Sequence, residues 1–312
     1  MKMEKKPVAL LTPAPIGSRW IAAFEKEAPE QAIQLNEAIS NPEAVELLLV
    51  WKHLEGSLKN FTKLKLLYSL GAGVDHLMSD PELPKEVPIC RIVDPLLAFS
   101  MSNYILLAVL DFQRRMDKYR WDQQNRVWDH YALPERDLRI GILGLGNLGQ
   151  DAAEKLVQLG FEVAGFSPSP KTISGVRCFH GDGLNSFLNT VNVLICTVPL
   201  TEKTRGLLNA SLFEKLPKGS FLINVARGKV QIEKDILTAL DSGQLSGAFL
   251  DVFEEEPLPT GSRLWSHPKV QITPHIASIT KPKAGVQQIL DNWSRLQKGE
   301  ALLHQVNVQK GY

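Results

Sequence analysis

The sequence predicts an α/β protein made of two doubly wound domains, each built on a mostly parallel sheet. Apolar runs of strand length alternate with helical patterns along most of the chain, which is typical of parallel strands connected by helices. The alternation forms two separate series. Because a chain of 312 residues also exceeds the size at which one hydrophobic core usually stops growing, two domains are expected.

The first series predicts four strands and an early helix. The strands span residues 8–11, 45–51, 64–69 and 89–92, and the helix spans 19–26. From about residue 100 the pattern becomes a long helix that continues toward residue 119, and a polar stretch rich in aromatic residues follows it. We place the domain boundary at the start of this long helix.

The second series is longer and predicts a complete doubly wound domain. Its expected strands span residues 139–143, 161–166, 193–198, 221–224, 248–252 and 270–273. Two of its expected helices span residues 148–159 and 232–240. A last helix at 283–298 follows all of these strands, so it is free to pack on the first domain.

Composition and charge argue against several classes of protein. The 35 Lys and Arg residues nearly balance the 34 Asp and Glu residues, so no basic excess indicates nucleic-acid binding. No uninterrupted apolar run has the length of a membrane span, and the run near the N-terminus is too short for a signal peptide. The cysteines, Cys90, Cys178 and Cys196, form no C-x-x-C pair, which argues against a disulfide framework or a zinc site. We expect a cytoplasmic protein that binds no metal and no membrane.

The sharpest local motif is the glycine-rich string Gly144-Leu145-Gly146-Asn147-Leu148-Gly149. It directly follows an expected strand and opens an expected helix, which is the context of a dinucleotide-binding, Rossmann-like domain. In that context Gly144 makes the tight turn, Gly146 admits a pyrophosphate close to the backbone, and Gly149 lets the helix pack closely on the strand. The pyrophosphate would lie at the helix N-terminus, where unpaired N–H groups favour an anion.

The end of the next expected strand bears on which dinucleotide binds. An NAD site usually has Asp or Glu there, hydrogen-bonded to the ribose hydroxyls. This chain has Ser167-Pro168-Ser169-Pro170-Lys171 instead, and Glu162 lies at the start of the strand. Hydroxyls and a lysine suit a 2′-phosphate. We therefore expect NADP(H), with NAD(H) as the alternative, and Ser167 and Lys171 as cofactor contacts.

Three further residues stand at the ends of later strands, where an open α/β sheet places its ligand crevice: Arg227, Glu256 and His275. Each alone has an ordinary structural explanation, as a surface ion pair, an exposed acid or a strand-end histidine. Together, an arginine, a carboxylate and a histidine beside a dinucleotide site form a set that can reduce a 2-keto acid.

With these motifs the sequence resembles the D-isomer-specific 2-hydroxyacid dehydrogenases, and it looks most like their glyoxylate/hydroxypyruvate reductase A branch. The matching stretches follow the family's order and comprise residues 70–75, 144–149, 198–201, 204–206, 224–228, 250–253, 256–257 and 273–275. The resemblance implies a substrate-binding domain made of residues 1–101 and 283–312. The dinucleotide-binding domain, residues 102–282, would be inserted between these two segments.

The resemblance also implies roles for the site residues. The arginine matching Arg227 holds the carboxylate and the carbonyl oxygen of the keto acid, which suits its planar, permanently charged fork. The histidine matching His275 is the general acid, and the glutamate matching Glu256 hydrogen-bonds it and fixes its tautomer. Asp251 would meet the nicotinamide end of the cofactor, or else cap its strand. The remaining implied cofactor contacts are Val198, Pro199, Thr204 and Ala226, together with Arg227 and His275.

For the substrate, the resemblance implies a loop lined by backbone amides. The N–H groups of Ala72, Gly73 and Val74 would hold the carboxylate without a formal charge. Trp51 resembles a substrate-pocket tryptophan of this branch, and a core aromatic is an equal alternative.

A homodimer is also implied, clasped through an arm at residues 120–136. The arm carries Trp121, Trp128 and Tyr131 among charged residues, and exposed aromatics at this density are typical of a partner-binding surface. A flap that covers the chain's own long helix is the alternative.

The predicted function is NADPH-dependent reduction of small 2-keto acids, glyoxylate to glycolate or hydroxypyruvate to D-glycerate. Within the same class, the alternatives are a reductase of bulkier keto acids such as phenylpyruvate and an NAD-linked D-lactate or phosphoglycerate dehydrogenase. Outside it, a dinucleotide-sensing protein with little turnover is a further alternative, which the intact set of Arg227, Glu256 and His275 disfavours.

Overall fold

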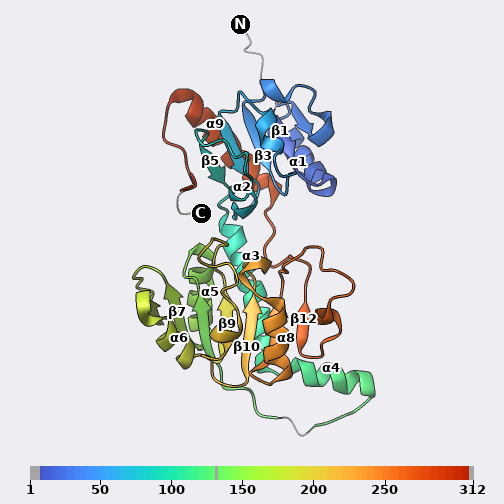
Figure 1. Cartoon of the computed structure of the whole chain (residues 1–312), viewed down its shortest axis with the longest axis vertical. Coiled ribbons are helices and arrows are strands. Elements are labelled where there is room, and N and C mark those ends of the chain that lie inside the picture. Colours follow the sequence, from blue (N-terminus) through green and yellow to red (C-terminus); the bar gives the residue numbers. More distant parts are fainter. Residues whose placement is uncertain (1–7, 131–132, 309–312) are drawn as a thin grey trace. The chain divides into compact units, whose positions relative to one another are not determined.

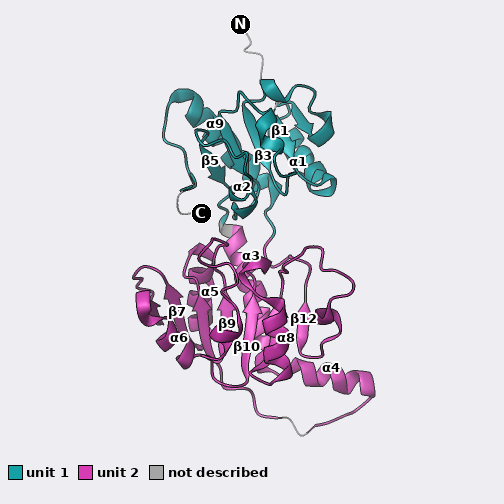
Figure 2. Cartoon of the chain, viewed as in Figure 1, with its two compact units in different colours: residues 1–95, 279–312 teal, residues 96–278 magenta. Residues whose placement is uncertain are grey.

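The computed structural model describes residues 8–130 and 133–308. The chain divides into two compact units (Figure 2). Unit 1 comprises Met1–Pro95 and Ile279–Tyr312, and unit 2 comprises Leu96–Ser278. Unit 1 is therefore built from both ends of the chain, whereas unit 2 is one continuous segment.

Unit 1 holds a five-stranded parallel sheet in the order β2-β1-β3-β4-β5 (Figure 1). Its strands are β1 (Val8–Leu11), β2 (Ile33–Leu35), β3 (Leu47–Val50), β4 (Leu66–Ser69) and β5 (Ile89–Arg91). The inner strands β3 and β4 are buried throughout, which explains their continuous apolar runs. The sequence did not predict β2, because this short edge strand is only half-buried and has no such run.

The helices of unit 1 come from distant parts of the chain. They are α1 (Ala14–Glu27), α2 (Asp75–Met78), α9 (Pro282–Lys298) and the 3₁₀ helices η1 (Asn36–Ala38), η2 (Pro42–Ala44) and η3 (Ser57–Asn60). α1 begins before residue 19, its predicted start, because a proline is well tolerated in the first helical turn. α9 packs against α1, and a Cβ on Gly285 would lie 2.4 Å from the ring of Trp20.

Unit 2 holds a seven-stranded parallel sheet in the order β12-β11-β10-β9-β6-β7-β8. Its strands are β6 (Arg139–Leu143), β7 (Glu162–Ser167), β8 (Val176–His180), β9 (Val193–Cys196), β10 (Ser220–Asn224), β11 (Leu245–Leu250) and β12 (Val270–Ile272). The prediction missed β8, an edge strand whose residues are exposed or half-buried. The two parallel sheets confirm the predicted α/β fold class.

Helices of unit 2 cover this sheet, except for α4, which projects away from it (Figure 1). They are α3 (Pro95–Gln113), α4 (Met116–Asn125), α5 (Asn147–Gln158), α6 (Leu184–Thr190), α7 (Ala210–Phe213) and α8 (Glu233–Asp241), with the 3₁₀ helices η4 (Gly181–Gly183), η5 (Gly228–Val230) and η6 (Arg263–Ser266). The single long helix expected from residue 100 is two helices. Arg115, with φ 57°, breaks the chain direction between α3 and α4.

Within the described part of the chain, α3 is the one helix long and apolar enough to cross a membrane, with a mean hydropathy of 1.4 over Leu96–Gln113. Its residues Met101, Ile105 and Val109 are buried in the core of unit 2. Packing in this core accounts for the apolar character of that face of the helix.

Candidate active site

The strand order of unit 2 reverses between β6 and β9. β7 and β8 lie on one side of β6, whereas β9 and the later strands lie on the other. Loops that leave neighbouring strands at such a point turn to opposite faces of the sheet and open the crevice in which α/β sheets bind ligands. The glycine-rich loop follows β6, and Val198 and Pro199 follow β9, so both reach this crevice.

The glycines of this loop fit a close-packed cofactor turn. Gly144 has φ 109°, a conformation that glycine adopts without strain. A Cβ on Gly149 would lie 2.0 Å from the carbonyl oxygen of Gly144, so α5 can begin here only with glycine. A Cβ on Gly146 would meet nothing within 4 Å, so the space beside this backbone is open. Buried Leu145 anchors the loop, and these residues fit a pyrophosphate at the N-terminus of α5.

The rest of the predicted motif opens the helix. Asn147 and Leu148 form its first turn, in which backbone N–H groups have no intrahelical acceptor. The hydroxyl of Thr197, at the end of β9, donates to the carbonyl oxygen of Gly144 at 2.7 Å. This bond joins the two strand ends at the reversal point. No sequence pattern indicated Thr197, since its role depends on a backbone acceptor far away in the chain.

The carboxyl end of β7 has the composition expected of an NADP site. Ser167 is the last residue of the strand, and its hydroxyl donates to the carbonyl oxygen of Ser169 at 2.7 Å. That bond shapes the turn that leads to exposed Lys171. Glu162 is the first residue of β7, at the opposite edge of the sheet, so the ribose end of the crevice carries no acid from this strand.

The loop after β9 is held in shape by its own hydroxyl groups. Thr204 donates from Oγ1 to the carbonyl oxygen of Pro199 at 2.6 Å and accepts from the backbone N–H of Thr201 at 2.8 Å. The predicted contacts Val198, Pro199 and Thr204 therefore belong to one preorganised turn.

A buried amide network connects the ends of β10 and β11. Asn224 Nδ2 donates to Gln231 Oε1 at 2.8 Å, and Gln231 Nε2 donates to the carbonyl oxygen of Val252 at 3.0 Å. Asn224 Oδ1 also accepts from the N–H of Ala226 at 3.0 Å. Sequence reasoning missed Gln231, because an isolated glutamine carries no spacing pattern.

This network fixes the backbone that presents Arg227. The residue after it, Gly228, packs so closely that a Cβ there would lie 1.7 Å from the carbonyl oxygen of Phe253. Arg227 itself is half-buried, and its Nη1 donates to the carbonyl oxygen of Ala226 at 2.7 Å. The guanidinium thus extends from a rigid segment at the carboxyl edge of the sheet.

The structure brings His275 and Glu256 together. His275 Nδ1 lies 2.8 Å from Glu256 Oε2, and Glu256 Oε1 accepts from the N–H of Phe253 at 3.2 Å. Because a carboxylate accepts, the proton of this bond belongs on Nδ1, and Nε2 is the ring nitrogen left to exchange a proton with a ligand. Both side chains are partly exposed, at 28% and 19%.

Asp251 organises the loop that carries His275. Its carboxylate accepts from the hydroxyl of Thr273 at 2.6 Å and from the backbone N–H groups of Ile276 and Ala277 at 2.8 and 2.9 Å. His275 has φ 56°, which is unfavourable for a histidine and is held by these bonds on both sides of it. Of the two roles expected for Asp251, these contacts fit the structural one, in which it caps the end of its strand.

In unit 1, the predicted substrate residues lie at the carboxyl edge of the other sheet. Trp51 directly follows β3, and loop 71–74 begins shortly after β4. A Cβ on Gly71 would lie 2.4 Å from the ring of Trp51, so the tryptophan packs directly on the start of the loop. The ring of His76 also contacts this tryptophan in an edge-on arrangement, with ring centroids 4.9 Å apart.

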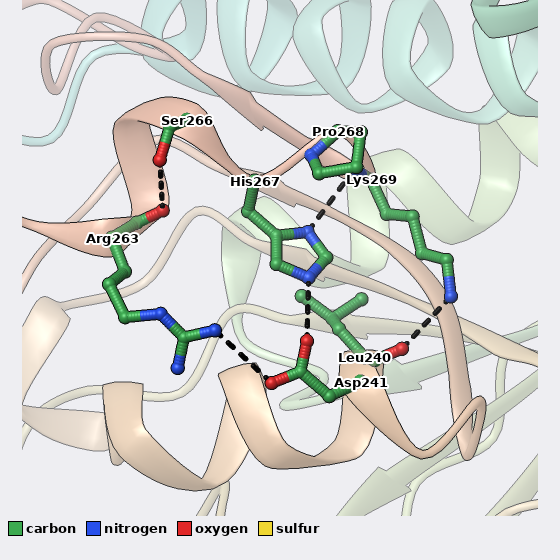
Figure 3. Close-up of a pocket in the computed structure, with 7 residues that line it drawn as sticks. All are labelled: Leu240, Asp241, Arg263, Ser266, His267, Pro268 and Lys269. Atoms are coloured by element: carbon green, nitrogen blue, oxygen red, sulfur yellow. Dashed lines mark hydrogen bonds and ion pairs between the residues drawn. The ribbon is translucent and has the colours of Figure 1, made fainter.

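A pocket of about 360 Å³ lies at the opposite edge of the unit 2 sheet (Figure 3). Asp241 is its central charge and pairs with Arg263 at 3.3 Å and with His267 at 3.4 Å. The Arg263 guanidinium lowers the pKa of Asp241. Leu240 and Asp241 lead into the start of β11, and residues 263–269 lead into the start of β12, so the pocket lies at the amino ends of these strands and is not part of the candidate site. The described residues contain no group of three or more His, Cys, Asp or Glu able to hold a metal ion.

The chain is similar to a known protein family and to two of its named relatives over most of its length. A family model described as D-isomer specific 2-hydroxyacid dehydrogenase, NAD binding domain, matches residues 106–277. A glyoxylate/hydroxypyruvate reductase A of Photorhabdus laumondii is 39% identical over 302 residues, covering 95% of this chain and 96% of the relative. The same-named protein of Serratia proteamaculans is 40% identical over 300 residues, covering 94% and 96%.

Solved structures agree over nearly the whole chain. An NADPH-dependent glyoxylate/hydroxypyruvate reductase from Sinorhizobium meliloti, in complex with NADP and sulfate, has a TM-score of 0.92 at 37% identity and covers 99% of this chain and 100% of its own. A D-isomer specific 2-hydroxyacid dehydrogenase from Xanthobacter autotrophicus, in complex with NADPH and MES, has a TM-score of 0.91 at 40% identity with the same coverage.

Proposed function

The chain belongs to the D-isomer specific 2-hydroxyacid dehydrogenases, and on that basis we propose that it reduces small 2-keto acids, glyoxylate or hydroxypyruvate, with NADPH. Curated relatives at this level of identity are named for that reaction. The observation that carries the proposal is the His275–Glu256 pair, 2.8 Å apart, at the same sheet edge as the glycine-rich loop and Arg227.

Each of these residues has a defined task in the proposed reaction. The bound reduced nicotinamide supplies the hydride. Arg227 binds the substrate carboxylate and carbonyl oxygen, and its charge draws electron density from the carbonyl carbon. His275 donates a proton from Nε2 to the carbonyl oxygen, and Glu256 keeps the ring oriented through Nδ1. In unit 1, the amides of Ala72–Val74 bind carboxylate oxygens, and Trp51 limits the size of the substrate.

NADP(H) is the preferred cofactor, with NAD(H) possible. Residues 144–149 would hold the pyrophosphate, and Val198, Pro199, Thr204 and Ala226 would line the crevice beside it. Ser167 and Lys171 would receive the 2′-phosphate, because β7 ends without the acid that selects NAD. Solved relatives in complex with NADPH or NADP support this assignment.

Oxidation of NADPH and NADH, followed by absorbance, tests the function with a panel of keto acids. We expect the highest kcat/KM with glyoxylate or hydroxypyruvate, and a preference for NADPH over NADH of roughly tenfold or more, since a paired 2′-phosphate contributes charge-assisted hydrogen bonds. A clear preference for phenylpyruvate or pyruvate would contradict the proposed substrate class. Tight dinucleotide binding without turnover of any keto acid would favour the sensor.

We further propose a homodimer held by the arm at 120–136. Trp128 and Trp121 are 91% and 58% exposed, and the outer face of α3 adds exposed Phe99 and Leu107. Arg120 pairs with Asp111 of α3, so the start of the arm is anchored on that helix. Exposed apolar side chains at this density favour a protein partner. Tyr131 lies outside the described residues.

Sedimentation velocity tests the dimer. The wild-type chain of 34.7 kDa should sediment as a species of twice that mass. Trp128→Asp should weaken the dimer by roughly tenfold or more, because a buried interface tryptophan is a typical hot spot. Trp265→Asp is the matched control: this tryptophan is 55% exposed on η6, and its loss should leave the mass unchanged. A monomeric wild-type protein would contradict the proposal.

A cytoplasmic location is proposed from the thiols. Cys90, Cys178 and Cys196 are all free. Burial raises the pKa of Cys90 and of Cys196 to about 12, so both remain as unreactive thiols. Free cysteines are typical of a reducing compartment, and cell fractionation would test this location.

A further inference from the structure

Side chains hold the carbonyl groups of loop 71–74. The Ser69 hydroxyl lies 2.7 Å from the carbonyl oxygen of Gly73 and 3.3 Å from that of Gly71. Arg91 Nη1 donates to the carbonyl oxygen of Ala72 at 3.0 Å. Ser69 ends β4, Arg91 ends β5, and the two are register partners across the paired strands. Side chains at two neighbouring strand ends therefore hold the loop through its carbonyl groups.

These bonds determine where the loop's amides point. In a trans peptide the C=O of one residue and the N–H of the next point in opposite directions, and the one cis bond among the described residues is Glu256–Pro257. Holding the carbonyl of Ala72 therefore turns the N–H of Gly73 away from Arg91. Among the described residues, the N–H groups of Ala72, Gly73 and Val74 donate to no acceptor. They form a set of free donors that faces away from the fastening side chains.

Arg91 also places a positive charge on the side of the loop where its carbonyl groups are held. The guanidinium is half-buried, and no carboxylate in the described ranges, 8–130 and 133–308, pairs with it. Burial lowers the pKa of Arg91 from its ordinary value, because water is removed from the charged form. The group still stays protonated at neutral pH. A cation that is partly desolvated and has no counter-ion favours an anion nearby.

Resting on the proposed function, we propose that Arg91 is a positioning residue for the substrate carboxylate. It fixes the peptide that aims the Gly73 N–H, and its uncompensated charge raises the affinity of the loop for an anion. Its effect should therefore appear in substrate binding more than in the chemical step. The cofactor residues belong to unit 2, so binding of NADPH should not depend on Arg91.

The test compares Arg91→Met with Arg91→Lys. Methionine is unbranched and apolar, so it removes both the donor and the charge. For this variant we expect the dissociation constant of oxalate, measured by calorimetry on the enzyme with NADP⁺, and the KM of glyoxylate to rise by about tenfold or more. The kcat and the KM of NADPH should change less than about threefold. Lysine keeps a charge and a donor, and should restore oxalate binding to within about threefold of wild type.

Arg295→Met is the matched control. It removes a guanidinium from α9 in the same unit, where Arg295 pairs with Asp291 and Glu300. Oxalate binding should be unchanged in this variant. The inference is overturned if Arg91→Met binds oxalate as wild type does, or if Arg91→Lys is as impaired as Arg91→Met. Because oxalate binding needs no turnover, it decides the role of Arg91 even if the wild-type enzyme reduces no keto acid, a result that would overturn the proposed function alone.

Discussion

Replacing Arg227 with alanine is expected to lower kcat/KM for glyoxylate by about 10³-fold or more, through a higher KM and a lower kcat together. The guanidinium would bind the substrate carboxylate in the ground state and meet the negative charge that develops on the carbonyl oxygen in the transition state. Steady-state oxidation of NADPH over a range of glyoxylate concentrations separates the two parameters.

Two companion variants make this result specific. Arg227→Lys keeps the charge but loses the planar fork, so it should recover only a small part of the activity. Arg263→Ala removes an exposed guanidinium from the pocket of Figure 3, at the opposite edge of the sheet, and should leave kcat/KM within about twofold of wild type. An Arg227→Ala enzyme with near wild-type kcat/KM for every active keto acid would remove Arg227 from the mechanism.

Replacing His275 with glutamine is expected to lower kcat by about 10²- to 10⁴-fold, with a smaller change in KM, because the side-chain amide is far too weak an acid to transfer a proton. The ring position is well defined: Glu256 holds Nδ1 at 2.8 Å, and the loop on both sides of the histidine is bonded to Asp251. Single-turnover oxidation of prebound NADPH measures the chemical step directly.

The chain offers a matched control for this variant. His267 is also paired with a carboxylate, that of Asp241, in the same unit but at the other edge of the sheet, so His267→Gln should keep kcat unchanged. The kcat of Glu256→Gln should lie between those of His275→Gln and His267→Gln, roughly 10- to 100-fold below wild type, because this variant loses one charge-assisted hydrogen bond. A His275→Gln enzyme that retains more than a tenth of the wild-type kcat would contradict the general-acid role.

The central elements of both sheets were predictable because their burial leaves a simple pattern. β1 and β6 begin and end at the predicted residues, Val8–Leu11 and Arg139–Leu143, since parallel strands covered on both faces are continuous apolar runs. Edge strands leave no such run, so β2 and β8 were missed. The break between α3 and α4 was also missed, because Arg115 adopts φ 57° without the glycine that would have indicated it.

For the candidate site, the sequence predicted which residues stand at the ends of strands, but it did not predict the hydrogen bonds that hold them. The resemblance to the D-isomer-specific 2-hydroxyacid dehydrogenases and to their glyoxylate/hydroxypyruvate reductase A branch is confirmed by the family match and by the relatives. The roles of Arg227, Glu256 and His275 stay predictions until the variants are measured. The bonds from Gln231 and Arg91 to backbone carbonyls could not be predicted, because they join residues that only the fold brings together.

The discontinuity of unit 1 has a consequence for how the protein is made. Its five strands are translated before unit 2, yet α9, whose Gly285 packs on Trp20 of α1, is translated after it. Unit 2 is contiguous and can complete its own core earlier, since domains generally fold as units during synthesis. Until α9 has been made, the apolar face of α1 that includes Trp20 lacks this cover, so unit 1 can complete its core only after the whole of unit 2 has been translated.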